Sequence, residues 1–112
     1  MVLYHVTFKK NVSKILYYGI LPNKGKVWRN YFGVKMGKAG VVFAWDSWDR
    51  AYTWAFKQWW DFGFKPTAII KCNVEKEYVS ASGTVHGKEY LIAGKVYPEQ
   101  IKDVFIFEWK KP

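Results

Sequence analysis

The sequence predicts an α+β protein, a single domain in which two helices pack on split, mixed or antiparallel β-sheets. Three observations predict this class. The chain has 112 residues, close to the commonest size of one domain. Half of the residues are apolar and 21% are aromatic, which is enough for a core and excludes a disordered chain. Two helical patterns fall in the first half and are followed mostly by runs of strand length, unlike a regular βαβ alternation. We therefore expect residues 1–112 to form one domain.

The first elements are a strand and a short helix. Residues 2–8 alternate in a way typical of a strand, and we expect the even-numbered side chains to face the core. His5 and Thr7 then share the other face. Asn11 is a suitable N-cap and Gly19 a suitable stop for a helix between them. Residues 22–40 show no clear periodicity, and a connection of that length is typical of a functional or mobile segment.

A buried strand and a longer helix follow. Residues 41–45 form a short apolar run, and Asp46 and Asp49 are placed to favour the N-terminus of a helix over about 47–60. The remaining expected strands are residues 67–74, 76–80, 89–94 and 104–109.

The positive charge is concentrated near the N-terminus. Residues 1–45 contain eight basic and no acidic residues, which accounts for +8 of the net charge of +9. Such asymmetry indicates an anionic partner, such as DNA, RNA or a nucleotide. The alternative is a solvated face that keeps the protein soluble.

The segment 22–40 interleaves basic and aromatic residues, a composition that suits phosphate contact and base stacking. A loop held against the domain by its rings is the alternative interpretation. The candidate nucleic-acid or phosphate ligands are Lys24, Lys26, Trp28, Arg29, Lys35 and Lys38.

Other classes of site are not indicated. Cys72 is the only cysteine, so we expect no disulfide, and the spacing of the two histidines does not suggest a metal site. No segment approaches the length of a membrane helix, and the N-terminus lacks the features of a signal peptide. We expect a cytoplasmic protein that does not bind a membrane. The sequence does not indicate an oligomeric state.

Three blocks of the sequence are informative in combination. The first block joins Tyr4-His-Val-Thr7 to the helix that ends in Ile15-Leu-Tyr-Tyr-Gly-Ile-Leu-Pro22. The second is Val42-Phe-Ala-Trp-Asp46 with the helix after it, and the last is Glu89-Tyr-Leu-Ile-Ala-Gly-Lys-Val-Tyr-Pro-Glu-Gln-Ile101. Together these blocks resemble the ADP-ribosyltransferase superfamily, a group that includes DNA-modifying toxins and RNA 2′-phosphotransferases.

The resemblance implies a site that cleaves the nicotinamide–ribose bond of NAD without a metal. His5 would bind the ribose on the adenosine side with Thr7 beside it, and Glu89 would stabilise the oxocarbenium-like cation. The chain has Val42 where the family carries a Tyr that stacks on nicotinamide. The aromatic residues that could replace it are Trp45, Tyr52 and Trp54.

The leading hypothesis is NAD-dependent ADP-ribosyl transfer, with nucleic acid as a plausible acceptor. Gly87, two residues before Glu89, is not the acid or amide of arginine- or asparagine-modifying enzymes, which disfavours an arginine acceptor. An RNA 2′-phosphotransferase is a second hypothesis, and a non-catalytic nucleic-acid-binding protein of the same fold is a third. The enzymatic hypotheses require His5 and Glu89 to meet across one furrow.

Overall fold

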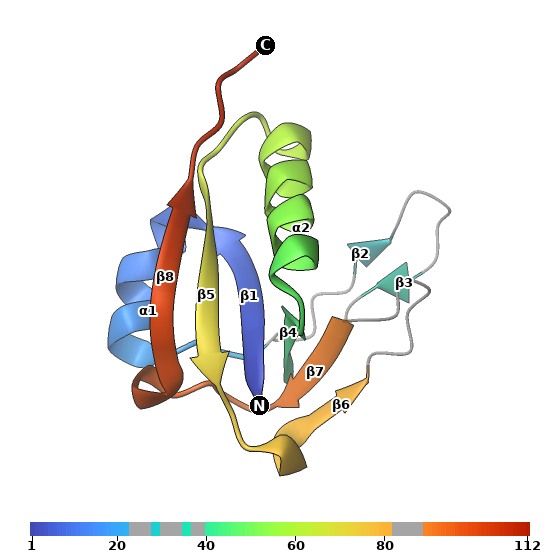
Figure 1. The fold of residues 1–112 in the computed structure, drawn as a ribbon, viewed down its shortest axis with the longest axis vertical. Coiled ribbons are helices and arrows are strands. Elements are labelled where there is room, and N and C mark those ends of the chain that lie inside the picture. Colours follow the sequence, from blue (N-terminus) through green and yellow to red (C-terminus); the bar gives the residue numbers. More distant parts are fainter. Residues whose placement is uncertain (23–27, 30–34, 37–39, 82–88) are drawn as a thin grey trace.

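A computed structural model describes residues 1–22, 28–29, 35–36, 40–81 and 89–112. Six strands form one sheet in the order β6-β7-β4-β1-β5-β8, and each of the neighbouring pairs is antiparallel (Figure 1). Two further short strands, β2 and β3, pair with each other apart from this sheet. The protein is therefore a compact α+β domain, as the sequence predicts, and the mixed pairing that was also considered is not found among the described strands.

The strands are β1 (Val2–Phe8), β2 (Trp28–Arg29), β3 (Lys35–Met36), β4 (Val41–Trp45), β5 (Thr67–Asn73), β6 (Val79–Ala81), β7 (Glu89–Ala93) and β8 (Ile101–Phe107). The helices are α1 (Val12–Tyr18) and α2 (Trp48–Asp61), with 3-10 turns η1 (Lys9–Asn11), η2 (Lys76–Tyr78) and η3 (Pro98–Gln100). The last strand begins and ends earlier than expected, and most of the strand expected at 76–80 is a 3-10 turn.

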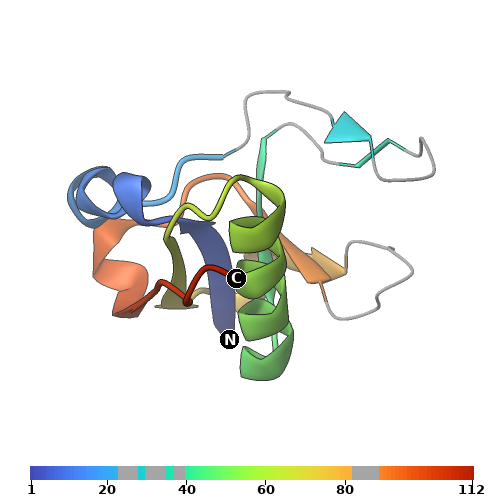
Figure 2. The same ribbon diagram turned by 90° about the horizontal axis from the view of Figure 1, so that it is seen from above.

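The two α-helices cover opposite faces of the sheet (Figure 2). Helix α1 contributes Val12 and Ile15 to a core that includes Leu3 of β1, whereas α2 contributes Ala51 and Ala55 to a second core. Because β1 is central, both of its faces are needed for packing. The expectation that only its even-numbered residues face a core is therefore wrong: Leu3 is fully buried, while Val2 at the end of the strand is 41% exposed.

Helix α1 ends at Gly19, where the chain crosses close to another segment. Gly19 has a φ of 83°, and the backbone of Ile20 then pairs with that of Val96 in an isolated bridge. A Cβ on Gly19 would lie 2.1 Å from the carbonyl oxygen of Val96. Glycine is required here both for its dihedral angles and for the close approach.

Aromatic side chains fill the face beneath α2. Small Ala51 and Ala55 allow the helix to approach the sheet closely, while Trp59 is almost fully buried. After β8, the ring of Trp109 stacks against Phe107 at a centroid distance of 5.5 Å. The residues after the last strand are thereby anchored against the α2 face.

Candidate functional site

The α2 face combines a carboxylate-bearing residue with two indole rings. Glu89, the first residue of β7, is directly opposite Trp45 in β4, so the two side chains lie on one face of the sheet. The ring of Trp54 on α2 lies 5.9 Å from that of Trp45. Three residues expected in the site therefore come together from β7, β4 and α2.

His5 lies on the other face of the sheet. Tyr4 is opposite Trp45 in the β1–β4 register, so Tyr4 shares the face of Trp45 and Glu89. Successive strand residues point to opposite faces, which places His5 on the face covered by α1. The expectation that His5 and Glu89 meet across one furrow is not met by this register.

The His5 ring has a structural contact of its own. Its Nδ1 lies 2.7 Å from the carbonyl oxygen of Phe43, across the seam between β1 and β4. Because a carbonyl only accepts, Nδ1 donates and carries the proton of the neutral ring. Burial lowers the pKa of His5 below its ordinary value, and the hydrogen bond to Phe43 opposes that shift. The environment thus favours a neutral imidazole that ties β1 to β4.

Thr7 is also part of the α1 face. It is buried, and its hydroxyl accepts a hydrogen bond from Asn11 Nδ2 at 3.0 Å. This contact helps to hold the connection between β1 and α1. Thr7 is therefore separated from Glu89 in the same way as His5.

Tyr52 lies on the side of α2 that faces β8. Its ring contacts Phe107 and Trp109 edge-on, and its hydroxyl accepts a hydrogen bond of 3.1 Å from Trp109 Nε1. Val42 is 2% exposed in the α1-face core, so it presents no surface for stacking. Of the expected stacking residues, Trp45 is directly opposite Glu89 but is only 7% exposed, and Trp54 packs against Trp45 from α2 and is half-buried.

A polar pair that was not expected from the sequence lies on the opposite face of the sheet, where β4 ends. The Tyr90 hydroxyl donates a hydrogen bond to the Asp46 carboxylate, whose negative charge raises the pKa of Tyr90. The second oxygen of that carboxylate, Oδ1, is buried and has no hydrogen-bond partner in the part of the chain that the structure describes. The alternation of β7 turns Tyr90 away from Glu89 and towards the face of Ala44, but its pairing with Asp46 depends on how β4 and β7 align.

The basic segment is described only in part. Trp28 and Arg29 of β2 pair with Met36 and Lys35 of β3, so the backbones of Arg29 and Lys35 are directly opposite. The candidate ligands Lys24, Lys26 and Lys38 lie outside the described residues.

No group of three potential metal ligands occurs among the described residues, and none of the described helices has the length and apolarity needed to cross a membrane. The chain matches no protein-family model and no curated protein.

Proposed function

We propose that this protein transfers ADP-ribose from NAD to a nucleic acid. The observation that carries the proposal is the group on the α2 face, where Glu89 and Trp45 share a row of the sheet and Trp54 packs against Trp45. The net charge of +9 supports an anionic acceptor. The resemblance of the three sequence blocks to ADP-ribosyltransferases supports the choice of NAD.

The chemistry requires a carboxylate near a flat apolar wall. As the bond between the ribose C1′ and the nicotinamide nitrogen breaks, the nicotinamide leaves as a neutral ring with the bonding electrons. Positive charge develops on the ribose, and the Glu89 carboxylate stabilises it more in the transition state than in the substrate. The acceptor then donates an electron pair to C1′ and loses its proton. Trp45 is only 7% exposed, so the half-buried indole ring of Trp54, which packs against Trp45, offers the surface on which nicotinamide stacks.

The register removes the meeting of His5 and Glu89 that the enzymatic hypotheses required, so this proposal rests on Glu89 with Trp45 and Trp54 alone. His5 therefore has a different role from the one implied by the resemblance. Its bond to Phe43 makes it a positioning residue, which holds β1 beside β4 and so fixes the row that contains Trp45. Contact with the ribose of NAD is not assigned to it.

The test compares Glu89→Gln with the matched control Glu108→Gln, an exposed glutamate near the C-terminus. Each variant is incubated with NAD labelled on the adenine side and with single-stranded or duplex DNA and RNA. We expect Glu89→Gln to lower label transfer by about 10²- to 10³-fold, the usual loss when one electrostatic contact to the transition state is removed. The control should retain wild-type transfer, and the Tm of each variant is measured so that a loss of transfer through unfolding is recognised. Undiminished transfer by Glu89→Gln would contradict the assignment.

A second candidate is a nucleic-acid-binding protein without catalysis, and the separation of His5 from Glu89 favours it specifically. A thermal-shift assay distinguishes the two candidates. If NAD leaves the Tm unchanged while an oligonucleotide raises it, and no label is transferred, the second candidate replaces the first.

An RNA 2′-phosphotransferase ranks below both. That family grips its phosphate with several arginines, whereas Arg29 and Arg50 are the only two in this chain. Lysine is the poorer bidentate partner for phosphate. Release of inorganic phosphate from a 2′-phosphorylated RNA would reverse this ranking.

A further inference from the structure

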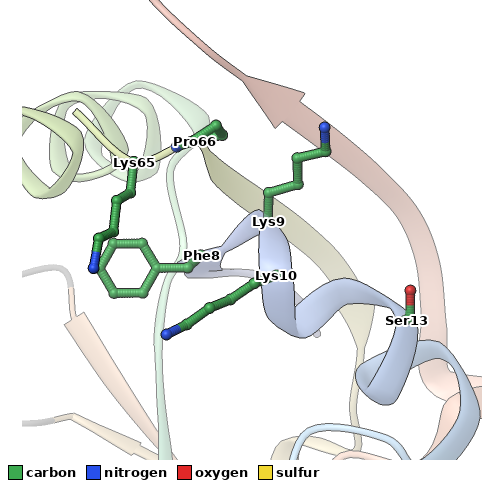
Figure 3. Close-up of a pocket in the computed structure, with 6 residues that line it drawn as sticks. All are labelled: Phe8, Lys9, Lys10, Ser13, Lys65 and Pro66. Carbon is green, nitrogen blue, oxygen red and sulfur yellow. The ribbon is translucent and has the colours of Figure 1, made fainter.

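A basic hollow lies at the end of β1, away from the group around Glu89. Its volume is about 350 Å³ (Figure 3). Its lining residues are Phe8, Lys9, Lys10, Ser13, Lys65 and Pro66. Three of these six carry a positive charge and none is acidic, so the hollow presents a local excess of positive charge.

Two distant parts of the chain form the hollow. The backbone N–H of Lys9 donates a hydrogen bond of 2.9 Å to the carbonyl of Pro66. The turn before Lys65 contains Gly63 and Phe64, both with φ between 60° and 80°. These contacts fix the approach of η1 to the start of β5, so the lysine backbones are held in place before any ligand arrives.

The positive charges are not neutralised locally. Figure 3 shows the side chains of Lys10 and Lys65 extending on the side of Phe8, with Lys9 extending to the other side of η1. Lys10 Nζ lies 5.8 Å from the centre of the Phe8 ring. None of these lysines forms an ion pair with any described residue.

The nearest acid in sequence is already engaged. Asp61, at the end of α2, pairs with Lys57 at 3.4 Å. The electrostatic repulsion between like charges that lack a counter-charge decreases when an anion binds beside them.

An exposed aromatic ring adjoins the hollow. Phe62 packs edge-on against Phe8 at a centroid distance of 5.7 Å, yet it is 59% exposed. More than half of the Phe62 side chain is thus accessible to an unpaired base, whereas the stacked bases of a duplex are not available to it.

We infer that this hollow binds the backbone of single-stranded nucleic acid, with Lys10 and Lys65 on phosphate oxygens and a base stacked on Phe62. The inference rests on the proposed function only in one respect: it identifies the bound strand as the acceptor of ADP-ribose. Binding itself requires neither NAD nor Glu89.

The experiment measures fluorescence anisotropy of a labelled oligonucleotide of about 12 residues, within the usual site size of a small domain. The variant K10Q/K65Q is compared with K76Q/K102Q, which removes two exposed lysines. Lys76 and Lys102 lie at the opposite end of the sheet, about 20 Å away along the strands.

The expected loss follows from counterion release. Each phosphate contact on a single strand contributes about 0.7 to the slope of log K against log salt concentration. Losing two contacts should lower the slope by about 1.4 and the affinity by about 25-fold at about 0.1 M salt. The control K76Q/K102Q should change affinity by less than about twofold, since scattered surface charges act weakly at this distance. A loss as large in the control as in K10Q/K65Q would overturn the inference.

A second variant tests the aromatic part without changing charge. Phe62→Ala should weaken single-strand binding by about fivefold or more and leave duplex binding unchanged. Equal losses for both forms would overturn the stacking assignment. A poly-glutamate peptide that displaces the strand at equal charge concentration would overturn the choice of nucleic acid, because it carries charge but no base.

Failures of the two proposals are distinguishable. If the hollow is correct and the transferase is not, Glu89→Gln binds the strand normally and no protein transfers label. If the transferase is correct and the hollow is not, K10Q/K65Q transfers label to the strand as fast as wild type.

Discussion

The burial of His5 predicts how the stability of the fold depends on pH. Burial lowers the pKa of His5, so the folded state keeps a neutral ring at a pH where the unfolded chain, with a pKa of about 6.5, takes up a proton. Above that pH both states are neutral and His5 adds no pH dependence. As the pH falls below it, the unfolded chain binds more protons, and the free energy of unfolding decreases until the folded-state pKa is reached.

The magnitude is bounded by one proton, which corresponds to at most about 1.4 kcal/mol for each pH unit. The assay is urea unfolding between about pH 5 and 7 of the wild type, His5→Asn and His5→Ala. His5→Asn keeps a donor near the position of Nδ1 but does not titrate, so its free energy of unfolding should vary less with pH. His5→Ala should show the same weaker dependence and lose about 1 kcal/mol from the missing hydrogen bond, plus the lost packing.

The comparison is controlled within the chain. His86 and all carboxylates are present in each of the three proteins, so their contributions cancel in the differences. Equal pH dependence in the wild type and both variants would refute the reasoning, because it would mean that folded His5 takes up its proton as readily as the unfolded chain.

Two further predictions concern packing. Gly19→Ala should destabilise the fold by about 4 kcal/mol, since it combines a disfavoured φ with a clash against the Val96 carbonyl. Gly94→Ala, at a similar φ of 77° but with nothing within 4 Å of the added Cβ, should cost only about 1–2 kcal/mol. Urea unfolding of both variants and the wild type measures these costs, and equal costs would contradict the close approach of Gly19 to Val96. Cys72 should react negligibly with a thiol reagent at pH 8 until the protein unfolds, because burial raises its pKa to about 11; rapid labelling of the native protein would contradict its burial.

The fold was predictable wherever the pattern was local. The apolar spacing and Gly19 predicted α1, although the side chain of Asn11 makes no capping bond and donates to Thr7 instead. Helix α2 was predicted to within one residue at each end. The register between strands was not predictable, because it depends on which residues of distant segments pair. That register separates His5 from Glu89, and no spacing along the chain could have shown it.

The candidate site was predictable only in part for the same reason. Trp45 and Trp54 were expected as stacking residues, and the contact between them required knowledge of the angle at which α2 crosses β4. The pairing of Tyr90 with Asp46 was missed because a single tyrosine and a single aspartate in sequence indicate nothing until two strands align.

Most of the aromatic rings pack against one another, which limits the rings that are available to stack on a ligand. Seven tryptophans and eight phenylalanines exceed what a core of this size obviously needs. Most rings on the α2 face pack against one another, as the nearly complete burial of Trp59 illustrates. Two groups of rings adjoin charged residues at the proposed sites. Trp45 and Trp54 lie on the face of Glu89, and Phe62 lies beside the basic hollow. A carboxylate with indoles suits a ring that departs from a developing cation, and lysines with a phenyl ring suit a phosphodiester and its base. The group around Glu89 therefore suits the cleavage of NAD, and the basic hollow suits the binding of the acceptor strand. Because the two groups share no residue, a variant of one should leave the function of the other intact.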